Sequence, residues 1–230
     1  MNTLQKAGGV SALINAAAYM IGMGIAFTLL APYLDAEPEQ YVAFMAANEA
    51  PLFVWHLLIY LVAGVFMVPL VLGMYERLRA SSPALAQITA VFGVIWTMTI
   101  IGSGMMIIHN QGVVAALYAQ DPAQATAVWL ALSAVEEGLG GAIELPGGLW
   151  ILLTSWAALR AGALPKGLTI LGLIIGAAGI LTVFPSLGNL GVVFGLGAVL
   201  WFIWVGIVMV RSHGEEQAAL QAALPFVRSN

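Results

Sequence analysis

The apolar residues of this chain form long continuous runs that are separated by short polar turns. A transmembrane helix needs about 20 mostly apolar residues, because the hydrocarbon layer is about 30 Å thick and each helical residue rises about 1.5 Å. By this measure the sequence predicts six membrane spans, at 10–31, 52–75, 84–109, 138–159, 168–184 and 189–210. Runs of this length exclude a membrane β-barrel, whose segments of about ten residues alternate in polarity. We therefore expect an all-α, polytopic membrane helix bundle.

The two longest segments between the predicted spans carry helix signals of their own. Residues 38–48 contain four residues at the spacing that puts side chains on one face of a helix. They are Tyr41, Phe44, Met45 and Asn48. Asp121 is a good N-cap residue, and Pro122 suits the first position of a helix. We expect two short helices on the outer face, with the apolar side of the first buried against the bundle or the lipid headgroups.

The second of these outer helices must break before the fourth span. An unbroken helix over 122–159 would be about 57 Å long, almost twice the hydrocarbon thickness. The glycine-rich stretch 138–141 and the Pro-Gly-Gly sequence at 146–148 are the expected break points.

The composition agrees with a membrane protein. Of the 230 residues, 61% are hydrophobic and 8% are charged, whereas soluble domains carry about 25% charged residues. The formal net charge of -4 excludes a nucleic-acid-binding protein, which needs a basic surface. Because the chain has no cysteine, disulfide, zinc-thiolate and iron–sulfur chemistry is excluded.

The basic residues all fall on one side of the membrane only if the chain crosses it six times. They are Lys6, Arg77, Arg79, Arg160, Lys166, Arg211 and Arg228. The positive-inside rule makes that side cytoplasmic. We therefore expect a multi-pass protein of the cell inner membrane, with both termini in the cytoplasm and an uncleaved first span. The chain divides into a transmembrane domain over 1–212 and a cytoplasmic tail helix over 213–230, whose start is marked by the capping pair Ser212 and Glu215.

One carboxylate is predicted to lie within the membrane. Glu144 precedes Leu159 by 15 residues, which places it about 22 Å above the inner boundary of the hydrocarbon. An ionisable group at that depth is costly unless a partner or a function satisfies it. Pro146 interrupts the helix beside the carboxylate, an arrangement found at transporter ion and substrate sites. The alternative is a carboxylate at a hydrated outer boundary that pairs with backbone groups.

Two histidines are expected at a similar depth on neighbouring antiparallel helices. His56 lies about 30 Å from the inner end of the second span, and His109 is the last residue of the third span. Together with Glu144 they form a predicted polar cluster. Its other ligand-binding candidates are Tyr60, Asn110 and Glu137, and Glu49 and Glu136 lie around it. The simpler interpretation is that each histidine only hydrogen-bonds at the membrane interface.

The same residue types leave metal chemistry open. His56, His109 and Glu144 are candidate ligands of Zn²⁺, two histidines on adjacent helices suit haem, and nearby methionines suit Cu(I). The chain has no H-E-x-x-H motif, and methionines in an apolar chain usually serve packing. The sequence identifies no cofactor and does not decide whether the protein is an enzyme.

The last two predicted spans are nearly without polar side chains. Gly172 and Gly176 in one span, and Gly191 and Gly195 in the other, form Gly-x-x-x-Gly pairs that let helices approach closely. We expect these spans to pack on each other or on a partner.

Two strings near the end of the chain follow a recognisable order. They are Glu144-x-Pro146-Gly147-Gly148-Leu149-Trp150 and Leu159-Arg160-Ala161-Gly162-x-Leu164-Pro165. They resemble the pattern of an uncharacterised family of bacterial six-span membrane proteins, classified as a domain of unknown function. The resemblance covers about the last 100 residues. It implies an α-helical bundle and no particular activity or site residues.

Three functions are compatible with these features. The leading hypothesis is an integral membrane protein that binds or translocates a small ligand or ion through an outer-facing polar pocket centred on Glu144. The first alternative is an accessory or scaffold subunit, whose glycine-faced helices contact partner subunits or a second copy in the lipid bilayer. The second is a metal- or haem-binding protein that uses His56 and His109. An apolar-lined cavity reaching Glu144 would favour the first, and a filled bundle would favour the scaffold.

Overall fold

The computed structural model describes residues 3–33, 35–141 and 143–227, with side chains except at 140, 141 and 212–227, and every regular element in that part of the chain is helical. The α-helices are α1 (Thr3–Ile25), α2 (Pro38–Ala47), α3 (Glu49–His56), α4 (Ala63–Leu78), α5 (Pro83–Tyr118), α6 (Pro122–Glu136), α7 (Leu145–Ala161), α8 (Lys166–Leu181) and α9 (Leu190–Val227). The π-helical segments are η1 (Ala26–Leu30), η3 (Leu57–Val62) and η4 (Glu137–Gly141), and the 3₁₀ turns are η2 (Ala31–Tyr33) and η5 (Pro185–Leu187).

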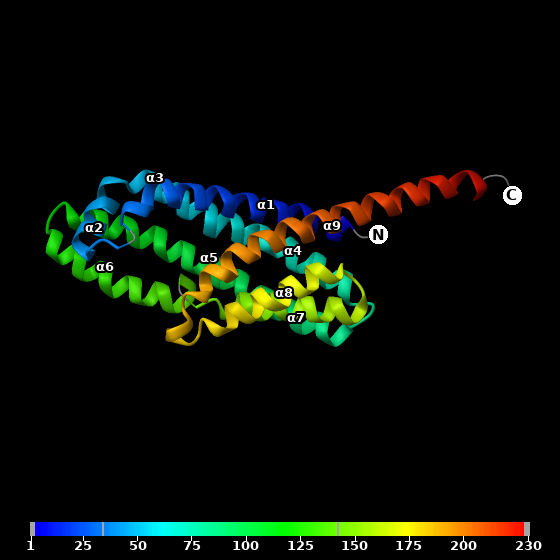
Figure 1. Ribbon diagram of the computed structural model, residues 1–230. Coiled ribbons are helices and arrows are strands. Elements are labelled where there is room, and N and C mark those ends of the chain that lie inside the picture. Colours follow the sequence, from blue (N-terminus) through cyan, green and yellow to red (C-terminus); the bar gives the residue numbers. More distant parts are fainter. Residues whose placement is uncertain (1–2, 34, 142, 228–230) are drawn as a thin grey trace.

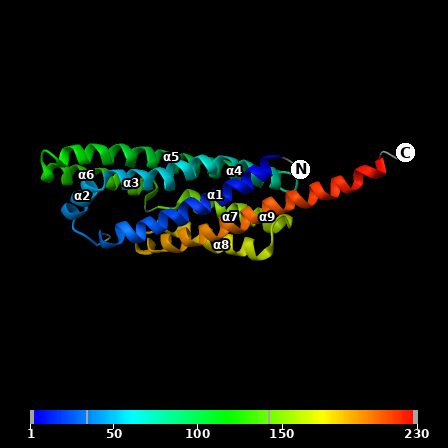
Figure 2. The ribbon, with the colours of Figure 1, turned by 90° about the horizontal axis from the view of Figure 1, so that it is seen from above.

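The long helices run antiparallel to one another and form an elongated bundle (Figures 1 and 2). Helix α1 packs against α4 and α9, while α7 packs against α8 and α5. The short helices α2 and α6 cover one end of the bundle, where both contact the far part of α5. Helix α1 begins and α9 ends at the opposite end (Figure 1).

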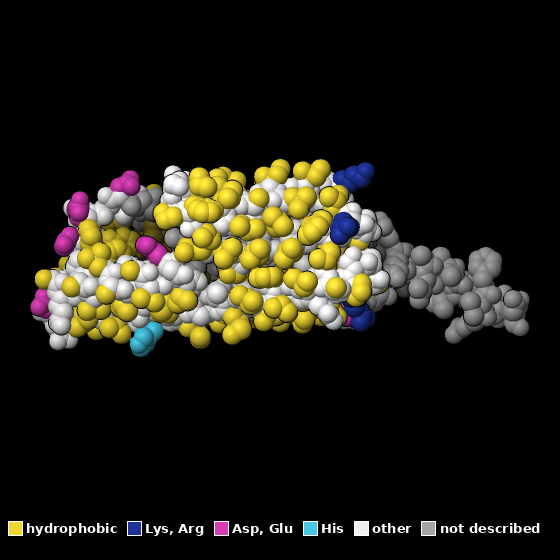
Figure 3. All heavy atoms as spheres, turned by 90° about the horizontal axis from the view of Figure 1, so that it is seen from below, with side chains coloured by type: hydrophobic (Ala, Val, Ile, Leu, Met, Phe, Trp, Pro, Cys, Tyr) yellow, Lys and Arg dark blue, Asp and Glu magenta, His cyan; other side chains and the backbone are white. Residues whose placement is uncertain are grey.

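Charge separates the two ends of this bundle. Figure 3 shows an apolar band along the side, with Lys and Arg side chains at one end and Asp and Glu side chains gathered at the other. We call these the basic end and the acidic end. Arg77, in the last turn of α4, donates from Nε to the carbonyl oxygen of Ala163 at 2.9 Å. The end of α4 is thereby joined to the turn between α7 and α8 at the basic end.

The structure supports a membrane-embedded protein with four candidate spans among the described residues. These stretches are Thr3–Tyr33, Glu49–Leu78, Pro83–Tyr118 and Leu190–Arg211. Helices α7 and α8 have 17 and 16 residues, which makes them about 25 Å long. They are shorter than the hydrocarbon thickness of about 30 Å, although the sequence predicts a span at each.

Two helices have ends that differ from the ends of the spans that the sequence predicts. Helix α5 continues to Tyr118, so His109 lies inside the helix and not at its end. No proline interrupts the run after Pro83, and α2 and α6 pack against the part of α5 beyond His109. Helix α7, which corresponds to the fourth predicted span, begins at Leu145 and not near residue 138, because the π-helical segment η4 and the non-helical residues 143 and 144 separate it from α6.

The two short helices that the sequence predicts at 38–48 and after Asp121 are confirmed as helices. Val42, Phe44 and Met45 of α2 are buried, and the Phe44 ring stacks on Tyr33 with centroids 4.0 Å apart. Asp121 caps α6 by accepting hydrogen bonds from the backbone of Ala123 and Gln124, each at 3.0 Å.

Helix α9 continues without a break to Val227, so the described part of the predicted tail does not form a separate helix. The side chains of Ser212 and Glu215, which the sequence suggests as a capping pair, lie outside the described side chains.

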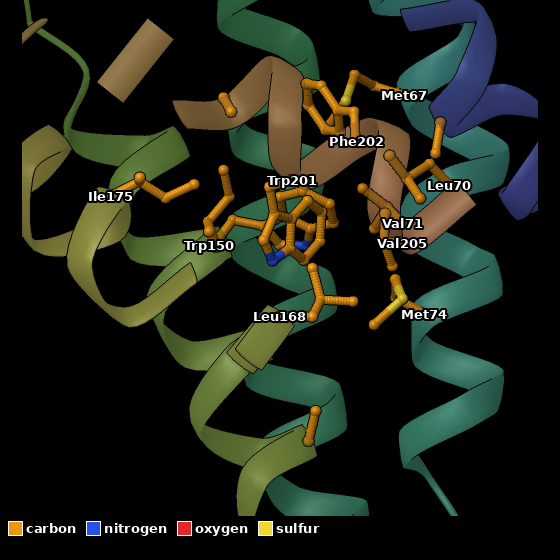
Figure 4. Packing of buried hydrophobic residues seen from close by; sticks show 14 of the residues in the cluster. Met67, Leu70, Val71, Met74, Trp150, Leu168, Ile175, Trp201, Phe202 and Val205 are labelled. Atoms are coloured by element: carbon orange, nitrogen blue, oxygen red, sulfur yellow. The ribbon is translucent and has the colours of Figure 1, made fainter. Parts of the chain in front are cut away.

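The main core lies between α4, α7, α8 and α9. Trp150 of α7 and Trp201 of α9 meet at its centre, with ring centroids 5.5 Å apart and planes 76° apart. Figure 4 shows Leu168 beside this pair and the methionines of α4 to one side. Both tryptophans are fully buried. Aromatic side chains of this size contribute much of the apolar area that packing removes from lipid or water.

Helices α7 and α8 approach closely at glycines. A Cβ atom at Gly148 would lie 2.6 Å from the backbone nitrogen of Ile180 and 2.7 Å from the carbonyl oxygen of Gly176. The predicted close packing at Gly172 and Gly176 is therefore present, directed mainly toward α7. No described helix packs closely against Gly195, where an added Cβ would meet nothing within 4 Å.

A candidate ligand cavity beside Glu144

A cavity of about 230 Å³ lies between the helices in the half of the bundle nearer the acidic end. Its walls come from α1, η3, α5, α9 and the turn before α7. The lining residues are Tyr19, Met23, Ile59, Tyr60, Trp96, Thr99, Ile100, Ser103, Ile143, Glu144, Pro146, Phe194, Gly195, Ala198 and Val199. The cavity is mostly apolar, with a few polar groups, which is the usual character of a small-molecule site.

Glu144 is the one acidic residue among the described residues that line the cavity. It occupies the N-cap position of α7, but its side chain makes no capping hydrogen bond. Its backbone N–H donates to Thr182 Oγ1 at 2.9 Å, and Thr182 in turn donates to the carbonyl oxygen of Gly179 at 2.7 Å. The backbone is therefore anchored to the end of α8, while no described residue donates a hydrogen bond to the carboxylate.

The remaining polar lining comes from three other elements. Tyr60 lies in η3, where the helix widens into a π-helical turn, a feature that often occurs at functional sites. Tyr19 comes from α1, and Thr99 and Ser103 come from α5. The Ser103 hydroxyl is buried and has no partner among the described residues, so it can still bond to a bound molecule.

Aromatic rings form the floor of the cavity. Trp96 lies 5.9 Å from Phe194 in an edge-on arrangement and 5.6 Å from Trp150, measured between ring centroids. Gly147 makes this packing possible, because a Cβ atom there would lie 2.5 Å from the Trp96 ring. The rings separate the cavity from the filled core nearer the basic end.

His56 is held outside this cavity by a hydrogen-bond chain. Its Nδ1 lies 3.1 Å from Oε1 of Gln111, and Gln111 Nε2 donates to the carbonyl oxygen of Glu49 at 2.6 Å. Because the Gln111 amide nitrogen faces Glu49, its oxygen is the acceptor and His56 Nδ1–H is the donor. The chain ties α3 to α5, which is a structural role.

The structure does not bring His109 to His56. His109 is exposed, whereas Gln111, the partner of His56, is buried. Two positions along a helix is a rotation of about 200°, so His109 faces away from the His56 side of α5. Glu144 forms no ion pair with either histidine among the described residues.

The other three candidates are divided between the cavity and the acidic end. Tyr60 lines the cavity with Glu144. Asn110 donates from Nδ2 to Oε1 of Glu136 at 2.8 Å, and Glu137 is exposed. Burial raises the pKa of the Glu136 carboxyl, the bond from Asn110 opposes the rise, and the nearby charge of Glu137 adds to it. Within the part of the chain that the structure describes, no group of three or more His, Asp or Glu side chains is placed to hold a metal ion.

Sequence reasoning found Glu144 and Tyr60 but missed the walls from the first and last spans. Tyr19, Phe194 and Gly195 are the main omissions. Asn15 and Tyr19, four residues apart in a span with few other polar side chains, were a usable signal, because i and i+4 share a helix face. Nothing local distinguishes Gly195 from a packing glycine.

The apolar helices and the bundle define an all-α protein of the membrane-embedded class. The chain belongs to the family described as domain of unknown function DUF4386, whose model matches residues 7–211. The match covers almost the whole chain, which corrects the expectation that the resemblance is confined to about the last 100 residues. No curated protein and no solved structure was found to match.

Proposed function

We propose that this protein binds a small ligand with a hydrogen-bond-donating or cationic group in the cavity beside Glu144. One observation carries the proposal: a carboxylate without a donor among the described residues lines a mostly apolar cavity. Apolar surroundings disfavour an isolated charged carboxylate, so a donor group that enters the cavity gains a strong partner. Tyr19, Tyr60 and Ser103 add hydroxyl groups that orient such a ligand.

The variant Glu144→Gln tests the proposal, because it keeps the shape of the side chain and removes its charge. Small amines should raise the unfolding temperature of the wild-type protein in lipid nanodiscs. Ligand at 100 times its Kd stabilises a folded protein by about 2.7 kcal/mol. The same amines should have at most a tenth of their affinity for the variant, and acetate should stabilise neither protein. An equal response of both proteins to amines would contradict the proposal.

In the membrane orientation that we propose for this function, the chain crosses the membrane six times and the basic end lies in the cytoplasm. In this proposal α7 and α8 cross the membrane in addition to the four candidate spans, and they lie within the same bundle (Figure 2). By the positive-inside rule the basic end would be cytoplasmic, which puts both chain ends and the extension of α9 beyond residue 212 there. The cavity would then lie in the outer half of the cell inner membrane, and release to either side would make binding part of translocation.

The scaffold hypothesis predicts a filled bundle, and the cavity weighs against it. The Gly191–Gly195 pair, which the sequence suggests as a partner-binding surface, has little packed against it in this chain. Binding of a second copy or a partner subunit at that surface would be a separate proposal. No observation favours it over contact with lipid.

A further inference from the structure

We propose that the ligand is a single-chain amphiphile with a protonated amine headgroup, which reaches the cavity from the membrane through an opening between α1 and α9. This inference rests on the proposed binding function and adds to it the ligand class and the route of entry.

Helices α1 and α9 are in close contact only near the basic end. A Cβ atom on Gly9 would lie 2.9 Å from Cβ of Met209, and one on Gly206 would lie 2.8 Å from Cγ of Leu13. Further along, the stacked rings of Tyr19 and Phe202 have centroids 6.3 Å apart. Beyond this ring contact the two helices diverge as they run toward the acidic end, as Figure 1 shows.

Beyond Tyr19, α1 follows a different neighbour. Trp55 Nε1 donates to the carbonyl oxygen of Gly22 at 2.9 Å, and a Cβ atom on Gly22 would lie against the Ile59 side chain. These contacts hold α1 to α3 and η3, while α9 remains beside α8. The cavity occupies the space between the diverging helices, with Met23 on one wall and Val199 on the other.

The wall on α9 is open at Gly195. This residue lines the cavity and is exposed, and an added Cβ atom would meet nothing within 4 Å. Its neighbours Val192 and Leu196 are 65% and 49% exposed, and Phe27 of η1, one turn beyond Met23, is 73% exposed. Side chains of this kind suit contact with lipid chains, so the opening faces the hydrocarbon.

The volume of the cavity and the carboxylate in its wall indicate the class of ligand. At about 230 Å³ the cavity is below the range of about 300–1,000 Å³ that encloses drug-sized ligands. A headgroup and the first carbons therefore fit inside, and a longer chain must leave through the opening. An ammonium group brings three donors for Glu144 and favours the Trp96 ring face, whereas a carboxylate headgroup would be repelled by Glu144.

The experiment compares dodecylamine with butylamine, dodecanol and dodecanoate on the full chain in phosphatidylcholine nanodiscs. A dodecylamine with a photoreactive diazirine at the chain end reports the route by mass spectrometry of the cross-linked peptides. The variants are Glu144→Gln at the headgroup and Gly195→Leu at the opening. Gly102→Leu is the matched control, because an added Cβ atom there also meets nothing within 4 Å and Gly102 does not line the cavity.

We expect cross-links on residues 23–27 or 192–199, competed by unlabelled dodecylamine and not by dodecanoate. Glu144→Gln and Gly195→Leu should each reduce cross-linking at least tenfold, and Gly102→Leu should leave it unchanged. If Gly195→Leu does not fold, the positions of the wild-type cross-links decide the route.

The outcomes separate this inference from the proposed function. Butylamine binding that depends on Glu144, together with dodecylamine that does not cross-link at the opening, would overturn the amphiphile and leave the binding function standing. Dodecanol that competes as well as dodecylamine would overturn the amine headgroup. Absence of Glu144-dependent binding for both amines would overturn both proposals.

Discussion

At the residue scale, the hydrogen-bond chain from His56 through Gln111 to the backbone of Glu49 joins α3 to α5. Gln111→Leu leaves the buried His56 N–H without an acceptor, which should lower the free energy of unfolding by about 1–3 kcal/mol. SDS-induced unfolding in mixed micelles measures this change. Adding His56→Phe to Gln111→Leu should then cost little more, since the unsatisfied donor is gone. Strictly additive effects of the two changes would contradict the pairing.

The Glu136 carboxyl, at the end of α6, should make stability depend on pH. Its pKa is raised in the folded protein, chiefly by burial, so the folded state holds the proton more tightly than the unfolded state. The contribution is present below the ordinary carboxyl pKa and is lost as pH rises through the raised value. Thermal unfolding from pH 4 to pH 8 should show this loss in the wild-type protein and a flatter profile in Glu136→Gln.

A variant at Asn110 provides the control for the titration of Glu136. Asn110→Leu removes the donor that opposes the rise, so the loss of stability should move to higher pH. Identical pH profiles for the wild-type protein and Glu136→Gln would show that this carboxyl does not titrate in the expected range.

At the scale of elements, the crossing of α7 and α8 positions the backbone of Glu144. In Gly148→Ala the new Cβ atom would lie 2.6 Å from a backbone nitrogen of α8, and no side-chain movement can relieve that contact. Overpacking of this kind costs about 1–3 kcal/mol, so SDS-induced unfolding should begin at lower SDS. The control is Gly102→Ala, where the Cβ atom has open space and alanine favours a helix over glycine by about 1 kcal/mol. Equal stability of the two variants would contradict the close crossing.

At the scale of the whole molecule, the separation of charge predicts the orientation in the membrane. Single cysteines at Asp35 and Asp121, near the acidic end, should react with a membrane-impermeant maleimide added to intact cells. Cysteines at Arg79 and Lys166, at the basic end, should react only after the cells are permeabilised. All four positions are exposed on the protein surface, so a lack of labelling reports the side of the membrane. Labelling of Arg79→Cys from outside would overturn the orientation.

Some features of this protein follow from the sequence alone, because they depend on local properties of the chain. Long apolar runs can satisfy their backbone in a membrane as helices, so the helical class and the positions of the long helices were predictable. Asp121 followed by Pro122 marked the start of α6, and the apolar face of 38–48 marked α2, since capping and amphipathicity act within a few residues. Glu144 was also identifiable, as a carboxylate within an apolar stretch.

Only the tertiary structure decided what surrounds that carboxylate. His109 and Glu144 are at comparable depth by residue count, yet the rotation of α5 turns His109 outward while Gln111 holds His56. The cavity lies where α1 is held to η3 at Gly22, beyond the stretch from Gly9 to Tyr19 along which α1 packs on α9, and Gly195 adds no side chain to its wall. Helix rotation and separation depend on contacts between residues far apart in the chain, which periodicity within a single helix does not encode.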